Sequence, residues 1–199
     1  GNLTTAAGVD ITLASATSVS AVNSATTKWT TVAVTDTSTT AALTGNKLAT
    51  VSITGSSGNA TLTGNGITTL NLNGAATGGT ATVTAAAGAR TLTVNTAGTT
   101  DSGSVTDGQA TAVVLNQTSA AVMGTLTAAK ATSVAINTTG TATTAGAESI
   151  SAALATSITL DGSTSSFPAL APLTTIAAGA SFALANGRDF AVAPVGGTF

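Results

Sequence analysis

Residues 48–73 have the sequence LATVSITGSSGNATLTGNGITTLNLN, in which one short pattern occurs twice. The pattern is a small polar residue, an apolar residue, any residue and a second apolar residue. Its first apolar residue is Val51 in one occurrence and Leu70 in the other. Leu62 lies between the two occurrences. Alternation with a period of two is typical of a β-strand. Each repeat is therefore expected to hold two or three short strands, separated by turns rich in Gly, Asn and Thr.

The same pattern continues along the chain with a nearly constant period. Eight apolar pairs share it: Ile11/Leu13, Val32/Val34, Val51/Ile53, Leu70/Leu72, Leu92/Val94, Val113/Leu115, Val134/Ile136 and Ile158/Leu160. A second strand position follows the first at one offset in the early repeats and at a slightly longer one in the later repeats, at Val22, Leu43, Leu62, Val83, Val105 and Leu126. A third inward position lies shortly before the first strand, at Trp29, Leu48, Ile67, Ala89, Ala110, Ala131 and Ala155.

These periods predict an all-β fold, a parallel β-solenoid (β-helix) of about eight coils with roughly 19–24 residues in each. One repeat cannot bury its inner face alone, but stacked repeats share a continuous core. Coils about 4.8 Å apart would form a rod roughly 40 Å long. A sandwich of antiparallel hairpins is the structural alternative. It explains the even strand spacing but not why equivalent positions match at one period along the chain.

The chain divides into two expected parts. Residues 1–165 carry the repeat and are predicted to form the solenoid domain. Residues 166–199 contain all three Pro and all four Phe residues, and we expect an irregular C-terminal cap or a subunit-contact segment there. The end of a solenoid exposes backbone groups and apolar core, so it needs a cover. Four apolar residues of this segment could form one last irregular coil: Leu173, Ile176, Phe182 and Leu184.

The composition excludes several classes of function. The chain has five basic and seven acidic residues, 6% charged residues in all, and no His, Cys or Tyr. Thiol catalysis, disulfide scaffolds, Cys-His metal sites and His-dependent triads therefore cannot be built from it. Scattered basic residues argue against nucleic acid as a partner, and no stretch is apolar enough for a transmembrane helix. We expect no enzymatic activity; a carbohydrate-active β-helix enzyme is the least favoured hypothesis.

Stacking converts each repeated position into a row of side chains along the rod. One such row follows the first strand of each coil: Thr35, Thr54, Asn73, Asn95, Asn116, Asn137 and Asp161. Stacked Asn side chains can hydrogen-bond to one another and to the backbone of turns. We expect this row to be a structural ladder at a corner of the solenoid, and such a ladder requires no ligand.

Hydroxyl groups are expected to point outward on either side of the second strand. The positions are Thr61, Thr63, Thr82, Thr84, Ser104, Thr106, Thr125 and Thr127. Regular Thr-x-Thr arrays of this kind resemble those of ice-binding proteins, in which repeated hydroxyl and methyl groups order surface water. Thr also favours strands and is abundant throughout this chain. Adhesion or ice binding through these rows is the alternative function.

Two carboxylates lie close together in sequence, Asp101 and Asp107, on either side of Val105. Oxygen ligands from such a loop could bind calcium, which takes about 6–8 of them. The simpler interpretation is a pair of solvated turn residues. Calcium is thus a weak candidate, and no other cofactor is expected.

The composition and the sequence KLATVSITGSSGNATLTGNGITTLNLNG at 47–74 resemble surface-layer proteins and large secreted adhesins of Gram-negative bacteria. The resemblance covers roughly residues 3–165. It implies an extracellular protein of the bacterial cell surface that assembles with copies of itself, with a surface glycan or lipopolysaccharide as a further partner. It also implies calcium, although the Gly-Gly-x-Gly-x-Asp nonapeptide of many relatives is absent. The predicted function is a structural, self-assembling subunit of a surface layer or extracellular fibre.

Overall fold

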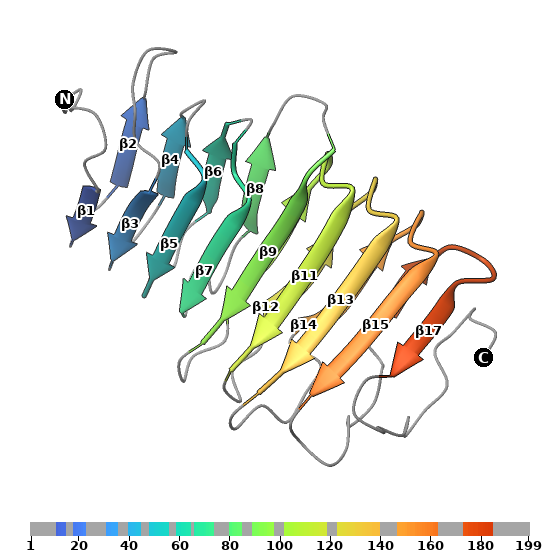
Figure 1. Ribbon diagram of the computed structural model, residues 1–199. Helices are drawn as coiled ribbons and strands as arrows, with labels where there is room; N and C mark the ends of the chain where they lie inside the picture. The colour runs from blue at the N-terminus through green and yellow to red at the C-terminus, as the bar shows by residue number, and fades with distance from the viewer. Residues whose placement is uncertain are drawn as a thin grey trace.

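The computed structural model is a parallel β-solenoid whose two sheets face each other (Figure 1). The structure describes residues 11–14, 18–22, 31–35, 40–44, 48–55, 59–64, 66–73, 80–84, 89–97, 102–118, 123–139, 147–162 and 173–184. Every regular element within these ranges is a strand, and no helix there could cross a membrane.

The first sheet has nine strands in the described residues. They are β1 (Ile11–Ala14), β3 (Thr31–Thr35), β5 (Thr50–Thr54), β7 (Thr69–Asn73), β9 (Thr91–Thr96), β11 (Ala112–Gln117), β13 (Ser133–Thr138), β15 (Ser157–Gly162) and β17 (Ser181–Leu184). The second, eight-stranded sheet holds β2 (Ser18–Val22), β4 (Thr40–Thr44), β6 (Ala60–Thr63), β8 (Thr80–Thr84), β10 (Ser104–Asp107), β12 (Met123–Thr127), β14 (Ala147–Ala152) and β16 (Leu173–Ile176).

Each strand pairs in parallel with the equivalent strand of the next coil, as β11 pairs with β9 on one side and with β13 on the other. The chain therefore advances by one strand spacing, about 4.8 Å, in each coil. The predicted parallel solenoid is confirmed. The sandwich is wrong because its hairpins would pair antiparallel. The nine-stranded sheet has one strand more than the eight predicted apolar pairs, since β17 continues it beyond β15.

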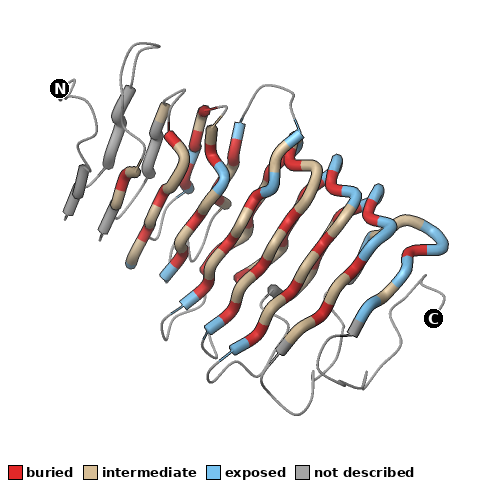
Figure 2. Tube along the Cα trace, in the orientation of Figure 1, coloured by how far each residue is buried: buried red, intermediate tan, exposed pale blue. Residues whose placement is uncertain are grey.

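The core lies between the two sheets and consists of alternate residues from both. Val51 and Ile53 in β5 are buried, while the residues beside them are half-exposed. Leu62 of β6 and Leu126 of β12 are fully buried from the opposite sheet. The same alternation is visible along successive strands in Figure 2. Val, Leu, Ile and Ala, with Met123, fill the space between the two sheets in the described residues.

The third inward position forms a buried corner between the end of the eight-stranded sheet and the start of the nine-stranded one. Its predicted members in the described residues are buried at Leu48, Ile67, Ala110, Ala131 and Ala155, and Ala180 adds one more. The prediction is wrong for Ala89, which is exposed. Trp29 lies outside the described residues.

The register between β7 and β9 differs from the prediction. The apolar pattern aligns Leu70 with Leu92, but Leu70 pairs with Val94, so this coil is longer than the pattern indicates. On the opposite sheet Val105 likewise pairs with Ala81 and not with Val83. A shift of two residues keeps every side chain on its own face. The hydrophobic pattern therefore cannot distinguish the two registers.

An ion pair occupies the core where the register changes. Asp107, at the end of β10, pairs with Val83 of β8 and is fully buried. The Arg90 guanidinium donates through Nη2 to Asp107 Oδ2 and through Nη1 to the carbonyl of Ile67, the latter at 2.7 Å. The other carboxylate oxygen, Oδ1, accepts the N–H groups of Gln109 and Ala110 at 2.9 and 3.0 Å. The pair thus ties the turn after β10 to the segments before β7 and β9.

The described part of the C-terminal region forms a further coil. β16 and β17 extend the two sheets, and Ile176 and Phe182 pack partly buried against the core. The predicted last coil is therefore confirmed, and its irregularity is a register shift in the β14–β16 pairing between Ile150 and Ser151. The remainder of the predicted cap, at 166–172 and 185–199, lies outside the described residues.

The Arg90–Asp107 pair is open to a direct stability test. Replacing one partner leaves a buried charge without its counterion, which typically costs about 3–5 kcal/mol. We expect Asp107→Asn and Arg90→Met each to lower the free energy of unfolding by about this amount in urea titrations. The double variant should lose less than the sum of the two, because no unpaired charge remains.

Lys130→Met is the matched control for these variants. Lys130 is exposed and donates to Gln109 Oε1 at 2.7 Å, so its loss should change stability by less than about 0.5 kcal/mol. Strictly additive effects in the double variant would contradict the assigned role of the pair.

Candidate functional site

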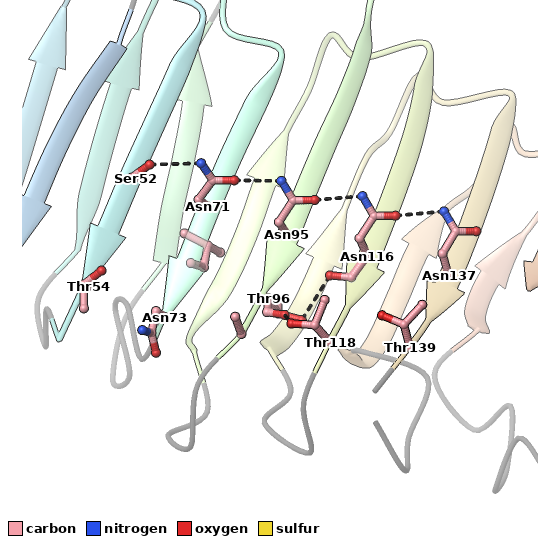
Figure 3. Close-up of a pocket in the computed structure, with 12 residues that line it drawn as sticks. Ser52, Thr54, Asn71, Asn73, Asn95, Thr96, Asn116, Thr118, Asn137 and Thr139 are labelled. Carbon is pink, nitrogen blue, oxygen red and sulfur yellow. Dashed lines mark hydrogen bonds between the residues drawn. The ribbon is translucent and has the colours of Figure 1, made fainter. Parts of the chain in front are cut away.

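A continuous ladder of side-chain hydrogen bonds runs along the outer face of the nine-stranded sheet (Figure 3). Asn71 Nδ2 donates to Ser52 Oγ at 3.0 Å, and Asn95 Nδ2 donates to Asn71 Oδ1 at 2.7 Å. Asn116 donates in the same way to Asn95 at 2.7 Å, and Asn137 donates to Asn116 at 2.8 Å. All four amides point in one direction, each donating toward the preceding coil. The rows are in register because the backbones of β5, β7, β9, β11 and β13 pair in parallel.

The predicted ladder is confirmed from Asn95 onward, but its start is corrected. Asn71 occupies the position before Asn95, and Asn73 lies in the next row beside Thr54. Asp161 pairs in register with Asn137, as expected. The start of the ladder differs from the prediction because β7 and β9 pair two residues away from the predicted register. Both Asn71 and Asn73 face outward from one strand, so the sequence pattern alone offers two equivalent starting points.

Each interior amide of the ladder retains unused hydrogen-bonding capacity. An Asn side chain has two N–H donors and an oxygen with two lone pairs. Along the ladder Asn95 and Asn116 each use one donor and one lone pair. The second donor and the second lone pair are available to a group outside. Since neighbouring amides hold each other, these groups are fixed in orientation, and aligned hydrogen bonds polarise one another.

The ladder lines a groove with a volume of about 530 Å³. The groove extends from the ladder to a second row at the C-terminal ends of the strands, and Figure 3 shows the two rows one above the other. The lining residues are uncharged: Ser52, Thr54, Asn71, Leu72, Asn73, Asn95, Thr96, Ala97, Asn116, Thr118, Asn137 and Thr139.

The floor of the groove is fixed by hydrogen bonds between coils. Thr96 is buried and donates through Oγ1 to the carbonyl of Asn116 at 3.4 Å. Thr118 donates through Oγ1 to the carbonyl of Thr96 at 3.3 Å. Beside Thr96 in the same inward row, Gln117 and Thr138 are also buried, so the apolar core becomes polar at this edge. This polar row was not predicted, although its signal is present in the sequence as three polar residues directly after the Asn positions.

The predicted Thr positions lie on the outer face of the eight-stranded sheet, in rows that differ from the prediction. Thr61, Thr82, Thr106 and Thr127 stand in one row, which Ser151 and Thr175 continue. Thr63 and Thr84 form a second row. Thr125 belongs to a third, with Thr80, Ser104 and Ser149.

Hydroxyl groups of the third row contact one another and the backbone. Thr125 Oγ1 and Ser149 Oγ are 2.7 Å apart, and Ser104 Oγ accepts the N–H of Thr125 at 3.0 Å. A Cβ at Gly124 would lie 2.8 Å from Ser104 Oγ, so this close approach requires glycine. The shift of two residues between β8 and β10 brings Thr82 beside Thr106, and so places four threonines in one unbroken row.

The two candidate calcium ligands are not both placed by the structure. Asp101 lies outside the described residues. Asp107 is not the solvated turn residue that the simpler interpretation assumed, because its carboxylate is buried and holds Arg90 and two backbone N–H groups. In the part of the chain that the structure describes, no three His, Cys, Asp or Glu side chains gather to form a metal site.

Comparison of the chain with protein-family models, with curated proteins and with solved structures finds no match.

The ladder predicts a measurable contribution to stability. Asn116→Ala removes one hydrogen bond to Asn95 and one from Asn137. At the usual net value of each bond we expect the free energy of unfolding in urea to fall by about 1–3 kcal/mol. Asn73→Ala is the control, because Asn73 is exposed in the same groove but lies outside the ladder, and it should change stability by less than about 0.5 kcal/mol. Equal effects of the two substitutions would show that the ladder adds nothing to stability.

Proposed function

We propose that the chain is a structural, self-assembling protein of the bacterial cell surface, a subunit of a surface layer or extracellular fibre. The observation that supports this proposal best is the combination of a rigid repeat with outer faces almost free of charge. Among the outward strand residues whose side chains the structure describes, Asp161 is the one ionisable residue; the others are mainly Thr, Ser, Asn and Ala. The proposal assigns no catalytic activity to the chain.

Low charge favours association of such faces for two reasons. Charged groups cost free energy when they lose water at an interface, and interface cores are accordingly depleted of them. Net charge also keeps dispersed proteins apart by repulsion. Here Arg90 and Asp107 are buried against each other, which removes two charges from the surface. Flat rows of small side chains can then approach copies of themselves closely.

Negative-stain electron microscopy of the purified chain, with and without millimolar Ca²⁺, tests this proposal. We expect ordered sheets or filaments. Thr106→Arg places a bulky charge at the centre of the four-threonine row and should raise the concentration needed for assembly by about tenfold, which corresponds to roughly 1.4 kcal/mol. Thr156→Arg adds the same group at an exposed turn between β14 and β15 and serves as the control. Dispersed particles under both conditions would contradict self-assembly by these residues.

A second candidate function is adhesion or ice binding through the same row. The observation that favours it is the in-register alignment of Thr61, Thr82, Thr106 and Thr127, which repeats hydroxyl and methyl groups at the coil spacing of about 4.8 Å. Thermal hysteresis of the dispersed protein measures ice binding directly. We expect Thr106→Arg to abolish most of any hysteresis and Thr156→Arg to leave it unchanged. A wild-type chain without hysteresis would eliminate the ice-binding form of this candidate.

A further inference from the structure

The asparagine-lined groove on the nine-stranded sheet has the chemistry of a binding site. We infer that it binds an extended, uncharged carbohydrate chain lying along the axis of the solenoid. The inference names a partner beyond the proposed function, and it does not depend on assembly. It follows from the capacity of the amides, the spacing of the coils, the absence of charge from the lining and the size of the groove.

The unused donors and acceptors of the ladder match sugar hydroxyls. A hydroxyl group donates one hydrogen bond and accepts others, so it can satisfy both the free N–H and the free lone pair of an Asn amide. Asn71, Asn95, Asn116 and Asn137 present this pair of groups once in each coil. Because the ladder already fixes the amides, a ligand does not have to order them on binding.

The spacing of the ladder suits a polymer better than a single small molecule. Successive coils are about 4.8 Å apart, which is close to the length of one sugar ring in an extended β-linked chain. The ladder extends from Ser52 to Asn137 over five strands of the nine-stranded sheet. A volume of about 530 Å³ accommodates several rings, and it lies in the range of known ligand sites, roughly 300–1,000 Å³.

The lining selects against charged ligands and in favour of amphipathic ones. None of the twelve lining residues is ionisable, so phosphate, carboxylate or ammonium groups would lose water without gaining an opposite charge. Thr54, Thr118, Thr139 and Ala97 supply methyl groups that can contact the C–H face of a sugar ring. None of the described lining residues is aromatic, so stacking on them contributes little for each sugar and affinity must come from several coils acting together.

Binding of defined oligosaccharides to the purified full chain tests the inference. Isothermal titration calorimetry with cello- and chito-oligosaccharides of two to six sugars measures affinity against length. We expect the hexasaccharide of at least one series to bind about tenfold more tightly than its disaccharide. Polygalacturonate is the charged comparison. Its titration into the protein should give no more heat than a titration of polygalacturonate into buffer alone.

Thr139→Arg blocks the groove without altering the ladder. Thr139 is exposed and lines the groove, so a larger side chain at this position can occupy the groove. Its backbone N–H donates to the carbonyl of Gln117, and the substitution leaves this hydrogen bond in place, so the fold is kept. We expect at least about a tenfold loss of affinity for the hexasaccharide. Thr156→Arg, outside the groove, should retain wild-type affinity. Circular dichroism and urea titration of both variants check that each is folded.

Three results would overturn the inference. One is the absence of binding by the wild-type chain to both neutral series, and another is equal binding by Thr139→Arg and the wild type. The third is tighter binding of polygalacturonate than of the neutral hexasaccharides. If Thr139→Arg prevents sheet or filament formation while no oligosaccharide binds the wild type, the groove is a contact between copies and the carbohydrate assignment fails, although the proposed assembly stands.

Discussion

Parallel backbone hydrogen bonding between successive coils is the constraint on which the other features depend. It places each residue directly beside its equivalent one coil away, about 4.8 Å distant. Most inward positions are therefore apolar in every coil, as the buried corner from Ala110 to Ala180 illustrates. An outward position repeats one chemical group along the whole face. The asparagine ladder and the threonine row are two consequences of this single arrangement.

Polar side chains supply what hydrophobic burial cannot, namely a unique alignment of one coil on the next. Stacked apolar rows tolerate a slip of two residues, because each side chain stays on its own face. Between β7 and β9, Asn95 meets an asparagine in either register, Asn71 in the observed one and Asn73 in the alternative, so the ladder does not choose between them. The buried Arg90–Asp107 pair connects three segments at the same place. This ion pair therefore favours the observed alignment of β9 on β7.

The two faces of the solenoid differ in what they offer to a partner. The eight-stranded sheet presents rows of hydroxyl and methyl groups, and some of these hydroxyls already contact one another, as Thr125 and Ser149 do. The nine-stranded sheet presents fixed amides above a groove, with donors and acceptors still unused. In the two proposals made above, copies of the chain pack on the first face and a carbohydrate chain binds on the second.

The sequence by itself determined the solenoid and the existence of an asparagine ladder, because apolar alternation at a nearly constant period has one economical way to be buried. The tertiary structure alone decided the register between β7 and β9, hence the role of Asn71, the row shared by Thr82 and Thr106, and the burial of Asp107. The reason is that a shift of two residues exchanges no inward residue for an outward one. The choice depends on contacts such as the Arg90–Asp107 ion pair, whose two partners lie in different coils and become neighbours only after the chain has stacked.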